Sequence, residues 1–129
     1  MSLLIKKILQ KIKEHENKMQ DSGWQNLQFM NSWHNDSSQN PAQYRKVGKI
    51  VYLRGVIYNG GNPNRNVAQL PDGYFSTSLV NNLYFITRID ASIQANPSVQ
   101  ITPQGGLIAP ANMTNGQRFE LDGISFLVN

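Results

Sequence analysis

The stretch Ile50-Val51-Tyr52-Leu53-Arg54-Gly55-Val56-Ile57-Tyr58 decides the fold class of this 129-residue chain. It is the most apolar run in the sequence, and its aliphatic side chains fall on both odd and even positions. A strand with this pattern is covered on both faces, so we expect a central β-strand here. Gly55 interrupts the run, and a glycine inside a strand indicates a bulge or the close approach of another backbone segment.

Short segments of apolar residues flank this stretch on both sides and are separated by Gly, Pro and Asn turn residues. We expect strands over residues 24–30, 67–70, 83–94, 99–101, 107–108, 119–121 and 124–128. Residues 31–41 are expected to form a polar loop, and Asp122-Gly123 between the last two strands is a hairpin signal. Because no helical pattern follows Gly23, residues 23–129 are predicted to form an antiparallel β-sandwich or jelly-roll-like head domain.

The first 22 residues carry a different pattern, with a period of three and four. Ile5, Ile8, Ile12, His15 and Met19 fall at successive a and d positions of a heptad repeat. Residues 1–22 are therefore predicted to form a coiled-coil helix that joins copies of the chain, ending at Asp21-Ser22-Gly23. Isoleucine at both a and d favours three or four helices over two, and we expect a homotrimer.

This helix is short, and its length limits what it contributes. At 1.5 Å per residue it spans roughly 25 Å, and an isolated helix of that length is marginally stable, so the head domains must help to hold the oligomer. A helix packed against its own head domain is one alternative. A membrane-surface helix is another, although the segment lacks the bulky aromatic residues common in such helices.

The positive charge of the chain belongs to this helix. Residues 1–20 contain five lysines and two glutamates, a net charge of +3, whereas the rest of the chain has a net charge of only +1. Lysines on the outer face of a coiled coil explain this distribution better than a phosphate-binding surface does, so no nucleic acid partner is expected. No apolar run approaches the roughly 20 residues that span a bilayer, so no membrane insertion is expected either.

Reactive side chains are sparse, and we expect no catalytic residue, metal or cofactor. There is no cysteine, and His34 with the neighbouring Asp36 is too small a set for a zinc site or a catalytic triad. Glu120 and Asp122 stand two residues apart and could serve as the paired carboxylates of a glycosidase. Asp122 is better explained as the turn residue before Gly123.

Saccharide binding requires an aromatic ring to stack on a sugar, with planar polar groups around it. The candidates lie in two loops and are Trp33, His34, Asp36, Tyr58, Asn59, Asn62, Asn64 and Arg65. Trp33 serves equally well as a core residue. The other large aromatic residues are most simply assigned to the core, namely Trp24, Tyr44, Tyr52 and Phe126.

Five segments occur together in an order that resembles a known family. They are Trp24-Gln25-Asn26-Leu27 with Asn31-Ser32-Trp33, Tyr44-Arg45-Lys46-Val47-Gly48, Val51-Tyr52-Leu53-Arg54-Gly55, Leu70-Pro71-Asp72-Gly73-Tyr74 and Leu121-Asp122-Gly123-Ile124-Ser125-Phe126. This order is similar to that in the C-terminal domains of tail-fibre, baseplate and receptor-binding proteins of bacteriophages and prophages of Gram-positive bacteria. The resemblance covers nearly all of residues 24–128.

The resemblance implies a homotrimeric structural protein of the virion tail, assembled in the host cytoplasm, in which a coiled-coil stem leads into a β-sandwich head. Its implied partners are further copies of itself, other tail or baseplate proteins and a host cell-wall saccharide. We therefore expect a non-enzymatic tail component that contributes to recognition of the host surface. A purely structural module that binds no glycan and a tail-associated glycan hydrolase are the alternatives.

Overall fold

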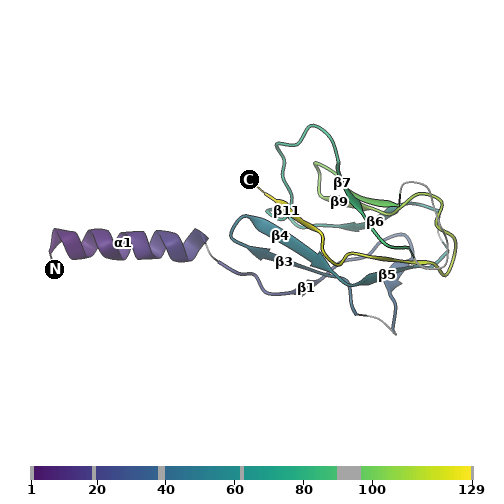
Figure 1. Cartoon of the computed structure of the whole chain (residues 1–129), viewed down its shortest axis with the longest axis horizontal. Coiled ribbons are helices and arrows are strands. Elements are labelled where there is room, and N and C mark those ends of the chain that lie inside the picture. Colours follow the sequence, from purple (N-terminus) through teal and green to yellow (C-terminus); the bar gives the residue numbers. More distant parts are fainter. Residues whose placement is uncertain (1, 19, 38–39, 62, 90–96, 129) are drawn as a thin grey trace.

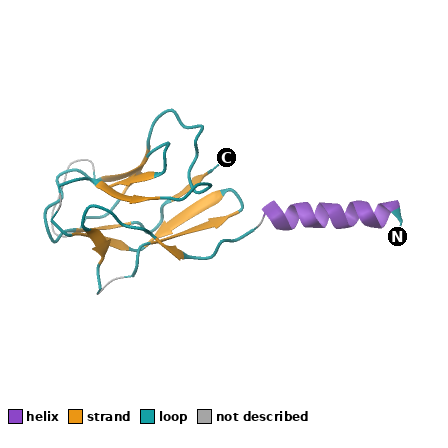
Figure 2. Ribbon diagram, turned by 180° about the vertical axis from the view of Figure 1, so that it is seen from behind, coloured by secondary structure: helices purple, strands orange, loops and turns teal. Residues whose placement is uncertain are grey.

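The chain folds into a single helix followed by a β head. The computed structural model describes residues 2–18, 20–37, 40–61, 63–89 and 97–128. Helix α1 (Leu3–Lys18) extends away from the head as a straight stalk instead of packing against it (Figures 1 and 2). Within the described residues no helix is long and apolar enough to cross a membrane.

The head contains three antiparallel sheets. The first has the order β1 (Gln25–Asn26), β3 (Gln43–Val47), β4 (Ile50–Arg54), β11 (Ser125–Leu127). The second has the order β10 (Arg118–Glu120), β5 (Val56–Asn59), β2 (Trp33–Asn35). The third has the order β6 (Asn66–Gln69), β9 (Gly106–Ile108), β8 (Ser98–Ile101), β7 (Leu83–Ile86).

One core holds the three sheets together. Its fully buried side chains come from all of them, and include Val51 of β4, Ile57 of β5, Val67 of β6, Val99 of β8 and Phe119 of β10. The sheets confirm the prediction of a mainly antiparallel β head domain that follows one short N-terminal helix. The predicted alternation after Leu83 is confirmed as far as Ile89, and residues 90–96 lie outside the described part.

The predicted central strand is two strands, β4 and β5, which run on from each other but belong to different sheets. Gly55 lies between them with a φ of 104°. A Cβ atom at this position would lie 2.1 Å from the carbonyl oxygen of Pro41, so no other residue fits without moving the backbone. The prediction of a bulge or a close approach at Gly55 is therefore confirmed.

The predicted hairpin at Asp122-Gly123 is wrong. Strands β10 and β11 do not pair with each other, because β10 pairs with β5 and β11 pairs with β4. Residues 121–124 lie opposite residues 53–55, so the longer segment carries one extra residue as a bulge. The Asp122 carboxylate accepts a 2.9 Å hydrogen bond from the Gly55 amide. A hairpin turn and this bulge both need a positive φ at Gly123, so the dipeptide alone does not distinguish them.

The linker between helix and head is tied to the first sheet. Helix α1 ends at Lys18, so the expectation that it ends at Gly23 is wrong. Asp21 instead forms a β-bridge with Val47, and the Gly48 amide donates a 2.9 Å hydrogen bond to the Gln20 carbonyl. Gly23 has a φ of 70° and turns the chain within this linker.

Two further segments differ from the expected pattern. The predicted strand over 24–30 is reduced to β1 and an isolated bridge at Phe29. The predicted polar loop over 31–41 contains strand β2, because burial of Trp33 against Phe119 draws this segment onto the edge of the second sheet. Neither outcome follows from the local sequence, since both depend on partners distant along the chain.

Gly55→Ala tests the point at which the chain passes from β4 in the first sheet to β5 in the second sheet. Gly123→Ala is its control. Both glycines have a positive φ, but a Cβ at Gly123 meets no atom within 4 Å. We expect Gly123→Ala to lower the free energy of unfolding by about 1 kcal/mol, which is the cost of the strained backbone alone. Gly55→Ala should lower it by more than about 3 kcal/mol, because a backbone segment must also move. Equal losses in urea unfolding would contradict the steric role of Gly55.

The pH dependence of stability tests the linker. The Arg45 guanidinium, which binds Asp21 through two nitrogens, and the Gly23 amide lower the pKa of the Asp21 carboxyl to about 2. A lowered pKa in the folded state means that Asp21 stabilises the fold above pH of about 4 and loses this effect as the pH falls towards 2. Asp21→Asn should therefore lower Tm much more at pH 7 than at pH 2, where about half of the carboxyl is protonated. The same Tm difference at both values would contradict the ion pair.

Candidate functional site

The second sheet lies at the end of the head opposite the helix (Figure 1). His34 of β2 and Arg118 of β10 each lie beside Tyr58 of β5 in the strand register. Side chains alternate across a sheet, so these three form a row on one face, while Trp33, Ile57 and Phe119 point to the core. We call His34, Asp36, Tyr58 and Arg118 the distal platform.

The distal platform combines two aromatic rings with an ion pair. The His34 and Tyr58 rings lie 4.7 Å apart between centroids and are tilted by 35°. The Arg118 Nη1 atom lies 2.7 Å from a carboxylate oxygen of Asp36. His34 Nδ1 lies 2.8 Å from the Asn35 carbonyl, which only accepts, so this nitrogen carries the proton and Nε2 is left to accept when the ring is neutral. Aromatic faces bordered by planar polar groups suit the stacking of a sugar ring.

Sequence reasoning selected three members of the distal platform and missed the fourth. His34, Asp36 and Tyr58 were expected to bind saccharide together, and the structure brings them onto one surface. Arg118 was missed because its partner Asp36 lies 82 positions away in the sequence. The alternation of Arg118, Phe119 and Glu120 was the available signal, since it places Phe119 inside and its neighbours outside.

Three of the other predicted saccharide-binding residues, Trp33, Asn59 and Arg65, line a hollow that lies apart from the platform and that we call the distal cleft. Its volume is about 370 Å³, and its lining residues are Trp33, Asn59, Pro63, Arg65, Pro110, Ala111, Asn112 and Met113. Trp33 is 4% exposed, packs edge-on against Phe119 and donates its indole hydrogen to the Asn64 carbonyl at 2.8 Å. It therefore has no open ring face on which a sugar could stack.

The asparagines of this region shape its loops. Asn59 is buried, accepts a 2.8 Å hydrogen bond from the Gly61 amide and donates to the Met113 carbonyl at 3.4 Å. Asn64 accepts a 2.9 Å hydrogen bond from the Asn66 amide. Asn62 lies outside the described residues. Asn59 and Asn64 thus hold backbone turns in place.

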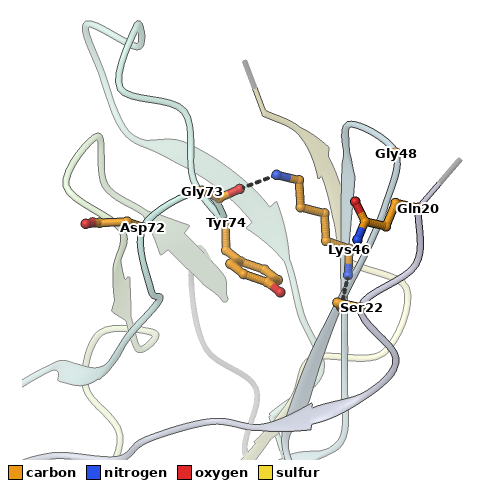
Figure 3. Close-up of a pocket in the computed structure, with 7 residues that line it drawn as sticks. All are labelled: Gln20, Ser22, Lys46, Gly48, Asp72, Gly73 and Tyr74. Atoms are coloured by element: carbon orange, nitrogen blue, oxygen red, sulfur yellow. Dashed lines mark hydrogen bonds between the residues drawn. The ribbon is translucent and has the colours of Figure 1, made fainter. Parts of the chain in front are cut away.

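A second hollow lies at the end of the head nearest the helix. This stem-side groove has a volume of about 340 Å³, and its lining residues are Gln20, Ser22, Lys46, Gly48, Asp72, Gly73 and Tyr74 (Figure 3). Lys46 Nζ donates to the Gly73 carbonyl at 2.7 Å and lies 5.7 Å from the Tyr74 ring, while the Asp72 carboxylate points away from it (Figure 3). The lysine thus holds the 71–74 turn against β3, which is a structural role.

A third surface surrounds Trp24 on the outer face of the first sheet. The Arg54 guanidinium lies 4.0 Å from the centre of the Trp24 ring, and Tyr52 is 37% exposed. The prediction that Trp24 and Tyr52 belong to the core is wrong, whereas Tyr44 and Phe126 are buried as predicted. Tyr52 and Arg54 share one face of β4, and Val51 and Leu53 share the buried face. The hollow here, of about 270 Å³, is shallow and bounded by Trp24, Arg45, Val47 and Tyr52.

The acidic residues considered for catalysis have other surroundings. Asp122 is bound to the Gly55 amide, in agreement with its expected turn role, although the turn is a bulge. Glu120 lies on β10, where its amide donates to the Arg88 carbonyl. Among the described residues there is no cluster of three or more His, Cys, Asp or Glu side chains that could hold a metal ion.

Comparison with known proteins identifies a similar fold. No protein-family model matches the chain. No curated protein matches it by sequence. The crystal structure of the receptor binding protein (gp15) of Listeria phage PSA is similar, with a TM-score of 0.69 and 16% sequence identity. The match covers 98% of this chain and 76% of that chain. The stalked β head described above therefore shares the fold of this phage receptor binding protein.

Proposed function

We propose that this chain is a bacteriophage tail protein that binds a saccharide on the host surface and catalyses no reaction. The distal platform carries this proposal, because it places two aromatic rings and an Arg–Asp pair side by side on an outward face. The fold of the Listeria phage receptor binding protein supports the phage assignment.

The position of the distal platform supports a binding role. The helix leaves the head at one end, and strand β5, which carries Tyr58, lies at the other, which is the end that a stalk presents outward (Figure 1). The motif residues Lys46, Gly55, Gly73 and Asp122 hold strands and turns together elsewhere in the head. His34, Tyr58 and Arg118 lie outside these motifs, so the platform can differ in ligand while the architecture stays the same.

The exposed helix supports assembly through copies of the chain. Ile5, Ile8 and Ile12 are each 49% exposed, and the helix extends away from its own head (Figure 1). Packing against the head, the first alternative, is therefore not observed in the described residues. We propose that these residues, with His15 and Met19, form the seam of a homotrimer that docks to other tail or baseplate proteins of the virion.

Ile8→Asp tests this seam, and Gln10→Asp on the outer face is the matched control. Light scattering of the intact chain should give the mass of three chains, and Gln10→Asp should not change it. Ile8→Asp should raise the dissociation constant of the trimer at least about a hundredfold, since three carboxylates would enter an apolar layer. A monomeric wild-type chain, or a trimer unaffected by Ile8→Asp, would overturn the proposal of a helical seam.

Tyr58→Ala tests the distal platform, with Tyr84→Ala as its control because Tyr84 is an exposed aromatic residue (65%) on β7 of the third sheet. An array of bacterial wall saccharides should identify a ligand for the wild-type chain. Tyr58→Ala should then weaken binding by about tenfold or more, which corresponds to about 1.4 kcal/mol, and Tyr84→Ala should leave it unchanged.

Two other outcomes of this experiment would contradict the proposal. Retention of no saccharide at all would favour a purely structural tail module. Release of new reducing ends from a bound polysaccharide would favour a hydrolase, and its loss in Glu120→Gln would assign the reaction to that carboxylate.

A further inference from the structure

The distal cleft contains a cationic group that the saccharide platform does not use. The cleft is lined by Asn59, Pro63 and Arg65 on one side and by residues 110–113 on the other, at the end of the second sheet. Trp33 and Asn59, which line it, point to the core side of that sheet, whereas His34 and Tyr58 of the distal platform point outward. The cleft is therefore a separate surface at the same end of the head.

Arg65 is the only charged residue among the described residues that line the cleft. It is half-buried, and its Nε atom donates to the Ala109 carbonyl at 3.0 Å. In the described part of the chain, Arg45 and Arg118 have carboxylate partners, but Arg65 has none within 4.0 Å. Its two terminal nitrogens are therefore left to bind an anion from outside the chain.

The backbone around Arg65 holds this guanidinium in place. The Ala109 amide donates to the Arg65 carbonyl at 2.9 Å, and the Arg65 side chain donates to the Ala109 carbonyl. These two hydrogen bonds join the two walls of the cleft. Pro63 and Pro110 restrict the backbone of each wall, and Asn59 links the Gly61 turn to Met113. A guanidinium fixed at Nε presents its remaining N–H groups as a planar fork that matches a carboxylate or phosphate.

The shape and lining of the cleft indicate what the anion is attached to. A volume of about 370 Å³ admits one sugar-sized group, and the walls are formed by prolines, Ala111, Met113 and the edge of Trp33. Asn112, which has a φ of 63°, also lines the cleft. These features suit a compact ring that bears one negative charge.

We propose that the distal cleft binds an acidic sugar, whose carboxylate or phosphate pairs with Arg65. The inference rests on the proposed function only in taking the anion to be part of a saccharide. Arg65 binds the negative charge of the ligand, and the aromatic rings of the distal platform stack on a sugar ring. Neutral sugars carry no negative charge to pair with the half-buried guanidinium, so they bind more weakly in this cleft.

The test is a titration of the full chain with glucuronate, glucose 1-phosphate and glucose in turn. Binding is monitored through the NMR signal of the Trp33 indole N–H group. Glucuronate, glucose 1-phosphate or both should shift this signal with a Kd below about 10 mM, and glucose should not. Arg65→Gln should weaken this binding at least about tenfold, and Arg65→Lys should restore only part of it, because an ammonium lacks the fork. The exposed Arg88→Gln should have no effect. The two acidic sugars distinguish a carboxylate ligand from a phosphate ligand.

Equal shifts with glucose, no shift with either acidic sugar, or unchanged affinity in a folded Arg65→Gln chain would each overturn the inference. Thermal unfolding establishes that Arg65→Gln is folded. Tyr58→Ala should leave acidic-sugar binding in the cleft unchanged, which separates this inference from the proposed function. If the array finds a ligand lost in Tyr58→Ala while Arg65→Gln changes nothing, the inference about the cleft fails alone.

Discussion

The contact between Gly55 and the Pro41 carbonyl is the constraint on which the head depends. At this point one strand leaves the first sheet and enters the second, and the Pro41 backbone passes so close that no Cβ fits. The opposite strand adapts with a one-residue bulge, and Asp122 binds the amide that the crossing would otherwise leave without a partner. The angle between the two sheets is thereby set by one glycine and one carboxylate.

The passage of the chain from β4 to β5 at Gly55 connects the two ends of the head. At one end, β3 and β4 hold the linker through the Asp21–Val47 bridge and the Gln20–Gly48 hydrogen bond. At the other end, β5 carries Tyr58 and leads into the loop that contains Arg65. The two ends are joined by β4 and β5, which follow each other directly at Gly55 and link the sheet that holds the linker to the sheet that carries Tyr58.

Local patterns in the sequence predicted the features that depend on local physics. The isoleucine spacing predicted the helix, and the alternation from Leu83 to Ile89 predicted which side chains face the core. The bulge at Asp122 was mistaken for a hairpin because a glycine with positive φ suits both structures, and the strand opposite is more than sixty residues away.

The candidate site was predictable only in part for the same reason. Trp24 was wrongly assigned to the core, and Trp33 was left open between the core and a saccharide site, because burial is decided by partners remote in sequence. Trp33 packs against Phe119 and donates to the Asn64 carbonyl, while Trp24 lies beside the guanidinium groups of Arg45 and Arg54 on the outer sheet face. The pairing of Asp36 with Arg118 needed the three-dimensional order of β2, β5 and β10.

The central claim is that the end of the head opposite the helix is the surface that contacts the host. Chemical-shift mapping of backbone amides in the intact chain, on titration with a wall saccharide that it retains, tests this claim most directly. The account predicts that the perturbed amides cluster on β2, β5, β10 and the 109–116 loop. Perturbations confined to the stem-side groove or to the surface around Trp24 and Tyr52 would contradict it.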